Sequence, residues 1–165
     1  MRNVTRHRRG GFTLVEVLIV VVILGILAAT VLPQFTSAGN DAKESALVQD
    51  LQTLRSQIEL YKFQHNGAFP GSQNGVIFED AMLTSTDADG TSGPIGTKPY
   101  GPFFIGQVPP NPFTGARGVR VVPDVPAAVP DDSTDDGWIY NPQTGRLKAN
   151  STGLAADGVT PLADL

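Results

Sequence analysis

Residues 8–16 read RRGGFTLVE, and residues 17–32 continue as VLIVVVILGILAATVL. From Phe12 to Leu32 there are 21 residues, and only Thr13, Glu16 and Thr30 among them carry polar side chains. At about 1.5 Å of rise per residue, such a helix is roughly 31 Å long, and the hydrocarbon core of a bilayer is about 30 Å thick. The stretch therefore predicts a helix, residues 12–32, that inserts into a membrane.

Two other interpretations of this stretch are a buried core helix and the apolar region of a cleaved secretory signal. A run this long is rarely buried inside a chain of 165 residues. A secretory signal needs a small-residue cleavage site beyond its apolar region. Ala28-Ala29 lies close to such a place, but the helical pattern continues after Pro33. Glu16 also has no role in an ordinary signal, since a carboxylate inside a bilayer costs about 3 kcal/mol and usually marks function.

The basic leader, Gly11, Phe12, Glu16 and the apolar run that ends at Pro33 together resemble the class III signal of type IV pilins and pseudopilins. In that family a short basic leader and a glycine precede phenylalanine-threonine-leucine-(isoleucine or valine)-glutamate. The resemblance implies that a prepilin peptidase cuts between Gly11 and Phe12 and then methylates the new amino group of Phe12. A glycine suits this cut, because a protease can approach its backbone closely.

The leader, residues 1–11, carries four positive charges and no acidic residue: Arg2, Arg6, Arg8 and Arg9. By the positive-inside rule, such a leader stays in the cytoplasm and the remainder of the chain is sent outward. We therefore predict a single-pass membrane protein with a cytoplasmic N-terminus and an exported head, and the resemblance implies that the membrane is the inner membrane and that the head is periplasmic. The resemblance adds that the subunits assemble into a periplasmic filament.

Glu16 has a candidate partner, because removal of the leader creates a cationic amine at Phe12. In the family this glutamate is thought to neutralise the amino terminus of a neighbouring subunit as that subunit joins the filament. An amine and a carboxylate attract strongly at low dielectric, although desolvation cancels much of the gain. The alternative is that Glu16 stabilises the start of its own helix, where the macrodipole favours an anion. Both roles can hold at different stages.

The partners that the resemblance implies are other copies of the chain in a helical homopolymer, the prepilin peptidase, an inner-membrane assembly platform, minor pseudopilins and membrane lipid. Without the leader, 8 basic residues face 16 acidic ones, a net charge of −8. An acidic chain of this kind shows no nucleic-acid footprint.

Residues 33–65 predict an amphipathic helix that continues the first. Pro33 lies inside the pattern and should bend the helix there. Apolar side chains recur at helical spacing: Phe35, Ala38, Ala42, Ala46, Leu47, Leu51, Leu54, Ile58 and Tyr61. The segment from Lys62 to Pro70, with Asn66-Gly67 as its helix stop, looks like the end of the first helix in major pseudopilins of type II secretion.

Residues 66–165 predict a periplasmic globular head. The fold class is α+β and pilin-like: a long N-terminal helix, half in the membrane and half amphipathic, packs on a small antiparallel β-sheet. We expect the tail beyond Thr152 to be loose. The expected elements are a short helix at 76–83, loops at 84–96 and 123–136, a strand at 119–122, and a hairpin of strands 138–140 and 146–149.

Four carboxylates lie within six residues, at Asp131, Asp132, Asp135 and Asp136. They repel one another unless a cation joins them, and such hard oxygen ligands suit calcium. Major pseudopilins of type II secretion are similar in placing a calcium loop before the last strands, but this segment lacks the glycine-rich spacing of that loop. A calcium site and a solvated acidic loop both stay open, and residues 87–90 are a weaker candidate for the same ion.

The sequence gives no pattern of an enzyme. The chain has no cysteine, and His7 would leave with the leader, so the mature chain keeps His65 alone, which we expect to be a polar residue at a helix end. Metalloprotease, phosphate-loop and nucleophile-elbow motifs do not occur. The resemblance of residues 62–70 to major pseudopilins, together with the absence of cysteine, instead favours a structural subunit of a type II secretion pseudopilus that promotes protein export. The alternatives are a type IV pilin of a surface fibre used for adhesion, motility or DNA uptake, and, less favoured, a tethered enzyme.

Overall fold

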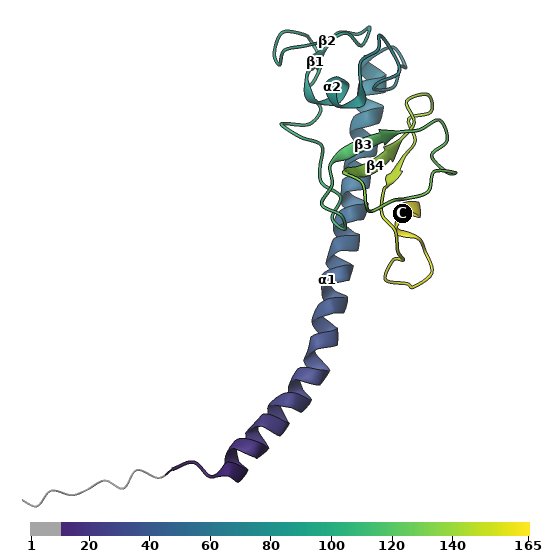
Figure 1. The fold of residues 1–165 in the computed structure, drawn as a ribbon. Helices are drawn as coiled ribbons and strands as arrows, with labels where there is room; N and C mark the ends of the chain where they lie inside the picture. Colours follow the sequence, from purple (N-terminus) through teal and green to yellow (C-terminus); the bar gives the residue numbers. More distant parts are fainter. Residues whose placement is uncertain (1–10) are drawn as a thin grey trace, which may run out of the picture. The chain divides into compact units, whose positions relative to one another are not determined.

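The computed structural model describes residues 11–165, apart from the side chains of residues 32–37. The chain divides into two units, Met1–Gly39 and Asn40–Leu165. Helix α1 (Leu14–Gln64) begins in the first unit and ends in the second (Figure 1). Its backbone stays helical at Pro33. The side chain of Pro33 lies outside the described residues, so the bend predicted there stays a prediction. The arginines of the leader lie outside the described residues as well.

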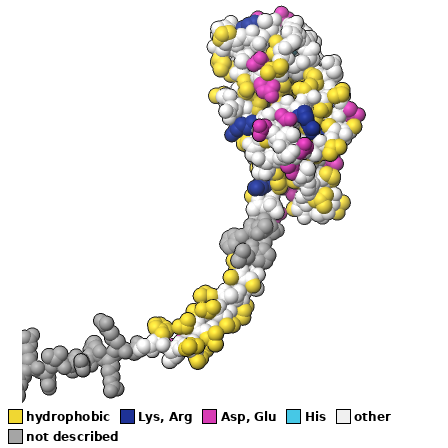
Figure 2. Space-filling model, in the orientation of Figure 1, with side chains coloured by type: hydrophobic (Ala, Val, Ile, Leu, Met, Phe, Trp, Pro, Cys, Tyr) yellow, Lys and Arg dark blue, Asp and Glu magenta, His cyan; other side chains and the backbone are white. Residues whose placement is uncertain are grey.

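In the first unit, the described side chains of the apolar helix up to Val31 are all exposed. Residues Leu14–Val31 have a mean hydropathy of 2.9, and none of this window is buried. Figure 2 shows hydrophobic side chains along this part of the helix. By length and composition the helix can cross a membrane, and its apolar surface needs lipid or other apolar helices to cover it.

In the second unit, one face of α1 forms the core of the head. The predicted stripe is confirmed from Leu47 onward, since the side chains at this spacing are buried: Leu47, Leu51, Leu54, Ile58 and Tyr61. They form one cluster with buried aromatic residues from α2 (Phe78–Leu83) and β4 (Asp136–Tyr140). Ala38 and Ala42 belong to the predicted stripe but are exposed. Leu47 lies nine residues after Ala38, so the core begins more than two helical turns later than the sequence pattern suggests.

The main sheet has the order β3-β4-β5, with β3 at Gly118–Val121 and β5 at Leu147–Ala149. The predicted hairpin is confirmed, because β4 and β5 pair antiparallel. The prediction of a wholly antiparallel sheet is wrong for one pair of strands, because β3 runs parallel to β4. The cause is the connection of 14 residues between them, 122–135, which is long enough to bring the chain back to the start of the sheet.

That connection covers the face of the sheet that is turned away from the core. Arg120, Ile139 and Lys148 lie side by side across β3, β4 and β5, and Ile139 is fully buried. Lys148 donates to the carbonyl of Ala128 at 2.7 Å, and Arg120 donates to that of Val129 at 2.8 Å. Both faces of the central strand are thus shielded from water.

Two segments are more ordered than the sequence suggests. The predicted loop 84–96 contains β1 (Ser85–Thr86) and β2 (Ser92–Gly93), which pair antiparallel. The C-terminal tail, expected to be loose, ends in a short 3-10 helix, η1 (Leu162–Asp164), with Leu162 and Ala163 buried. The tail is ordered by packing on the core of the head, whereas β1 and β2 pair with each other and are tied to the head through Thr86 and Tyr100.

We expect Leu51→Ala to lower the free energy of unfolding by about 2–5 kcal/mol, because the truncation leaves a cavity in the packed core. Leu51 is only 1% exposed and belongs to the central cluster. Denaturant unfolding of the full chain in detergent measures the change. The matched control is Leu60→Ala on the same helix, where the side chain is 41% exposed and the loss should be well under that of Leu51→Ala. Equal losses in the two variants would contradict this packing.

Candidate functional site

The predicted cleavage site, Gly11-Phe12, lies just before α1 in an exposed segment without regular structure. The Phe12 side chain is 86% exposed, and no atom lies within 4 Å of where a Cβ on Gly11 would be. This peptide bond is therefore open on all sides within the described residues. Such access is what a membrane-embedded peptidase requires, while the cut itself and the methylation of Phe12 stay predictions.

Thr13 and Glu16 form a capping box at the first turn of α1. The backbone N–H and the hydroxyl of Thr13 donate to Glu16 Oε2 at 3.2 and 3.1 Å, and the Glu16 backbone N–H donates to Thr13 Oγ1 at 3.2 Å. This reciprocal arrangement satisfies helix N–H groups that have no partner within the helix. The carboxylate thus stabilises its own helix start in the single subunit. Pairing of Glu16 with the amine of another copy stays a prediction.

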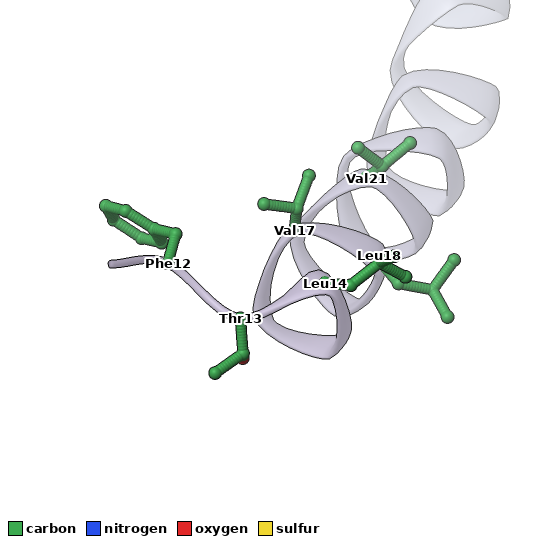
Figure 3. A pocket seen from close by; sticks show the side chains of 6 residues that line it. All are labelled: Phe12, Thr13, Leu14, Val17, Leu18 and Val21. Atoms are coloured by element: carbon green, nitrogen blue, oxygen red, sulfur yellow. The ribbon is translucent and has the colours of Figure 1, made fainter. Parts of the chain in front are cut away.

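A shallow apolar hollow of about 470 Å³ lies beside this first turn. In Figure 3, Phe12 and Val17 lie on one side of the chain and Thr13 points the other way. The hollow is lined by Phe12, Thr13, Leu14, Val17, Leu18 and Val21. An exposed surface of this kind, with a single hydroxyl in it, suits lipid chains or another apolar helix better than a polar small molecule.

The acidic residues before β4 do not converge. Asp131, Asp132 and Asp135 are exposed. Asp131 Oδ1 accepts hydrogen bonds from the backbone N–H and the hydroxyl of Ser133, at 2.9 and 2.6 Å, and these bonds lower the pKa of Asp131. Asp132 accepts from the backbone N–H and the hydroxyl of Thr152. Each of these two carboxylates thus has local donors of its own.

No group of three or more acidic, histidine or cysteine side chains in the described part of the chain is placed to hold a metal ion. The carboxylates of the loop therefore do not fit a calcium site in this arrangement, and the calcium predicted at Asp131, Asp132, Asp135 and Asp136 stays untested. At the weaker candidate, Asp87 instead accepts from Lys98 Nζ at 2.5 Å.

His65 has a role that the sequence analysis missed. Its side chain is fully buried at the end of α1, and its ring stacks on Tyr61 with the centroids 3.6 Å apart. Nδ1 lies 2.7 Å from the Tyr61 carbonyl oxygen, which can only accept, so Nδ1 carries the proton. Nε2 then accepts from the Thr86 hydroxyl at 2.8 Å, which ties β1 to α1. The spacing of four residues from Tyr61 was the signal, since it places His65 on the buried stripe.

We expect the stability of the head to fall as the pH drops from 7 to 5, and His65 to carry part of this change. Burial lowers the pKa of His65, although the hydrogen bond to Tyr61 and the charge of Asp89 oppose the shift. The unfolded chain therefore binds a proton more readily than the folded chain. The His65 contribution is complete above the ordinary histidine pKa of about 6.5 and is lost as the pH falls through the lower value of the folded protein.

Denaturant unfolding at a series of pH values measures this slope, with His65→Gln as the control. Glutamine keeps a polar side chain that can hydrogen bond but does not titrate. The variant should be less stable at neutral pH and should show a smaller slope between pH 7 and 5. An unchanged slope in the variant would mean that other groups cause it.

Parts of the sequence match known proteins. Residues 6–32 match the prokaryotic N-terminal methylation motif. The chain is 42% identical over 71 residues to type II secretion system core protein G of Pseudomonas aeruginosa, a match covering 43% of this chain and 49% of that protein. It is 35% identical over 83 residues to the protein of the same name from Aeromonas hydrophila, covering 50% and 55%.

The protein of that name from Vibrio cholerae is 38% identical over 78 residues, covering 47% of this chain and 51% of the relative. The chain thus spans about half the length of the curated relatives it matches. No solved structure matches the chain. The sequence-based resemblance to pilins and pseudopilins is confirmed by the methylation motif and these relatives.

Proposed function

We propose that the chain is a structural subunit of a type II secretion pseudopilus. In this proposal the subunit is inserted in the inner membrane, cleaved after Gly11, methylated at Phe12 and polymerised through its N-terminal helix to promote protein export. The observation that carries the proposal is the methylation motif at residues 6–32, which coincides with an apolar helix of which nothing is buried. The names of the relatives supply the secretion system.

The exposed helix supports polymerisation on physical grounds. Large apolar side chains from Phe12 to Val31 are each more than 40% exposed. Leaving such a surface in water costs about 25 cal/mol for each Å². In this proposal, lipid covers the apolar surface before assembly, and the helices of other copies cover it in the filament. A change between two apolar environments costs little, so subunits can leave the bilayer and join a polymer.

The head has a different part in the proposal, as a rigid structural body rather than a catalytic one. Its buried stripe on α1, its sheet and its packed tail form one core.

The proposed partners are the prepilin peptidase, an inner-membrane assembly platform and minor pseudopilins, with the head in the periplasm.

Deletion of the gene in its host tests the proposal. We expect export of folded proteins to the medium to stop and surface fibres to persist, and the wild-type gene should restore export. Secretion is measured in the culture medium and fibres are counted by electron microscopy. If fibres disappear and export continues, the chain serves a surface pilus and the proposal is wrong.

A further inference from the structure

Asn150 lies at the centre of the acidic loop 131–136, directly after β5, and is fully buried. Three oxygens of the loop converge on its amide nitrogen. Nδ2 donates to the carbonyl oxygen of Asp131 at 3.0 Å, to Thr134 Oγ1 at 3.1 Å and to the carbonyl oxygen of Asp136 at 2.7 Å. The two amide hydrogens, which carry partial positive charge, are therefore shared among three inward-facing oxygens.

The other side of the same amide fixes its orientation. Asn150 Oδ1 accepts the backbone N–H of Asp131 at 2.8 Å and Arg120 Nη2 at 3.3 Å. Both of these groups are donors, so they cannot face an NH₂ group. The backbone N–H of Asn150 also donates to Gly137 at 2.9 Å, which anchors the residue to β4. Turning the amide over would place donors against donors on one side and oxygens against an oxygen on the other.

The same loop is where the sequence suggested calcium, and its side chains do not fit that ion. Calcium takes six to eight oxygen ligands at about 2.3–2.6 Å. Here the convergent oxygens are already hydrogen bonded to Asn150, while Asp131, Asp132 and Asp135 are exposed. A cation at the centre would have to displace a buried amide that bridges the loop to the sheet.

We propose that the amide of Asn150 closes this loop in place of a metal ion, so that the head folds without calcium. The Asp131 carboxylate is stabilised from its own side, by Ser133 and by the charge of Arg120. Asp132 is held by Thr152, two residues beyond Asn150. The repulsion among Asp131, Asp132 and Asp135 is thus reduced by solvent exposure and, for the first two, by local donors. This inference concerns the head alone and does not depend on the filament that the chain serves.

Thermal unfolding of the full chain in detergent, with excess EDTA or excess calcium chloride, tests the proposal. The wild-type protein should unfold at the same temperature in both. Asn150→Asp replaces the NH₂ group by an oxygen and gathers four oxygens around one point. In EDTA this variant should unfold several degrees below the wild type, and calcium should raise its unfolding temperature.

The control is Asn141→Asp in the hairpin turn. Asn141 is also buried, and its Oδ1 accepts the backbone N–H groups of Gln143 and Thr144, but its Nδ2 faces the single carbonyl of Pro123. This variant should lose stability without any response to calcium. The proposal is overturned if calcium stabilises the wild-type protein, or if Asn150→Asp is as stable as the wild type in EDTA. The wild-type measurement decides the matter even if the variant does not fold.

Discussion

Replacing Gly11 by valine is expected to abolish cleavage and to leave the full-length precursor in the membrane. The substitution causes no steric conflict, because Gly11 is exposed and an added Cβ meets no atom within 4 Å. The fold of the chain should therefore not change. A branched side chain would instead block the close approach of the peptidase to the backbone. Mass spectrometry of the membrane-extracted protein should find Met1 in the variant and Phe12 as the first residue of the wild type.

Gly25→Val is the matched control. Gly25 lies within the apolar segment, and an added Cβ there also meets nothing within 4 Å. The control adds the same side chain, but away from the peptide bond that is cut. It should be cleaved normally. A mature-sized product from Gly11→Val would show that the cut lies elsewhere or does not depend on this glycine.

Replacing Glu16 by alanine should leave cleavage intact and should prevent or strongly slow polymerisation. The structure shows Glu16 in the capping box, and the predicted charge pair with another copy would be a second and larger contribution. Loss of the capping box costs about 1 kcal/mol of helix stability. Loss of the charge would leave the amine of another copy without a partner in an apolar environment, and breaking such a buried pair costs about 3–5 kcal/mol. Sedimentation of cross-linked filaments from the host membrane measures assembly.

Two further variants separate the charge of Glu16 from its capping role. Glu16→Gln can still accept the hydrogen bonds of Thr13 but carries no charge, and it should fail to assemble as the alanine variant does. Thr13→Val keeps the carboxylate and removes the hydroxyl that the helix start uses at 3.1 and 3.2 Å. It should polymerise with at most a small loss. Normal assembly of Glu16→Gln would mean that the cap, and not the charge pair, is what the filament needs.

The contacts of Glu16 in the single subunit also affect how it would pair with another copy. In the described structure the carboxylate of Glu16 is held by Thr13 of the same chain. A charge pair between copies would have to compete with these bonds. The capping bonds are exposed to water, whereas the charge pair between copies would be shielded from it. Glu16 should therefore leave Thr13 for the amine of another copy only when apolar helices exclude water from the pair.

Much of the candidate site could be predicted from the sequence because it depends on neighbours along the chain. The apolar segment is a matter of composition and length, and none of its described window, Leu14–Val31, is buried. Thr13 and Glu16 meet because residues three apart lie on the same side of the first helical turn. The same local logic predicted the buried stripe of α1 from Leu47 onward and the hairpin of β4 and β5.

The tertiary structure alone decided the features whose partners are distant in the sequence. The sequence around Val119 does not indicate that β3 runs parallel to β4, because the direction of β3 relative to β4 depends on the path of the connection between them. The buried His65 ring finds its hydrogen-bond partner in Thr86, 21 residues away, and the acidic loop is hydrogen bonded to Asn150, directly after β5.

Local pattern thus fixed where the chain is apolar and helical, since those properties depend on the preference of each segment for water or lipid. The partner of each buried polar group was decided only by folding. Many side chains can satisfy a hydrogen bond, and the packed core determines which of them comes within reach.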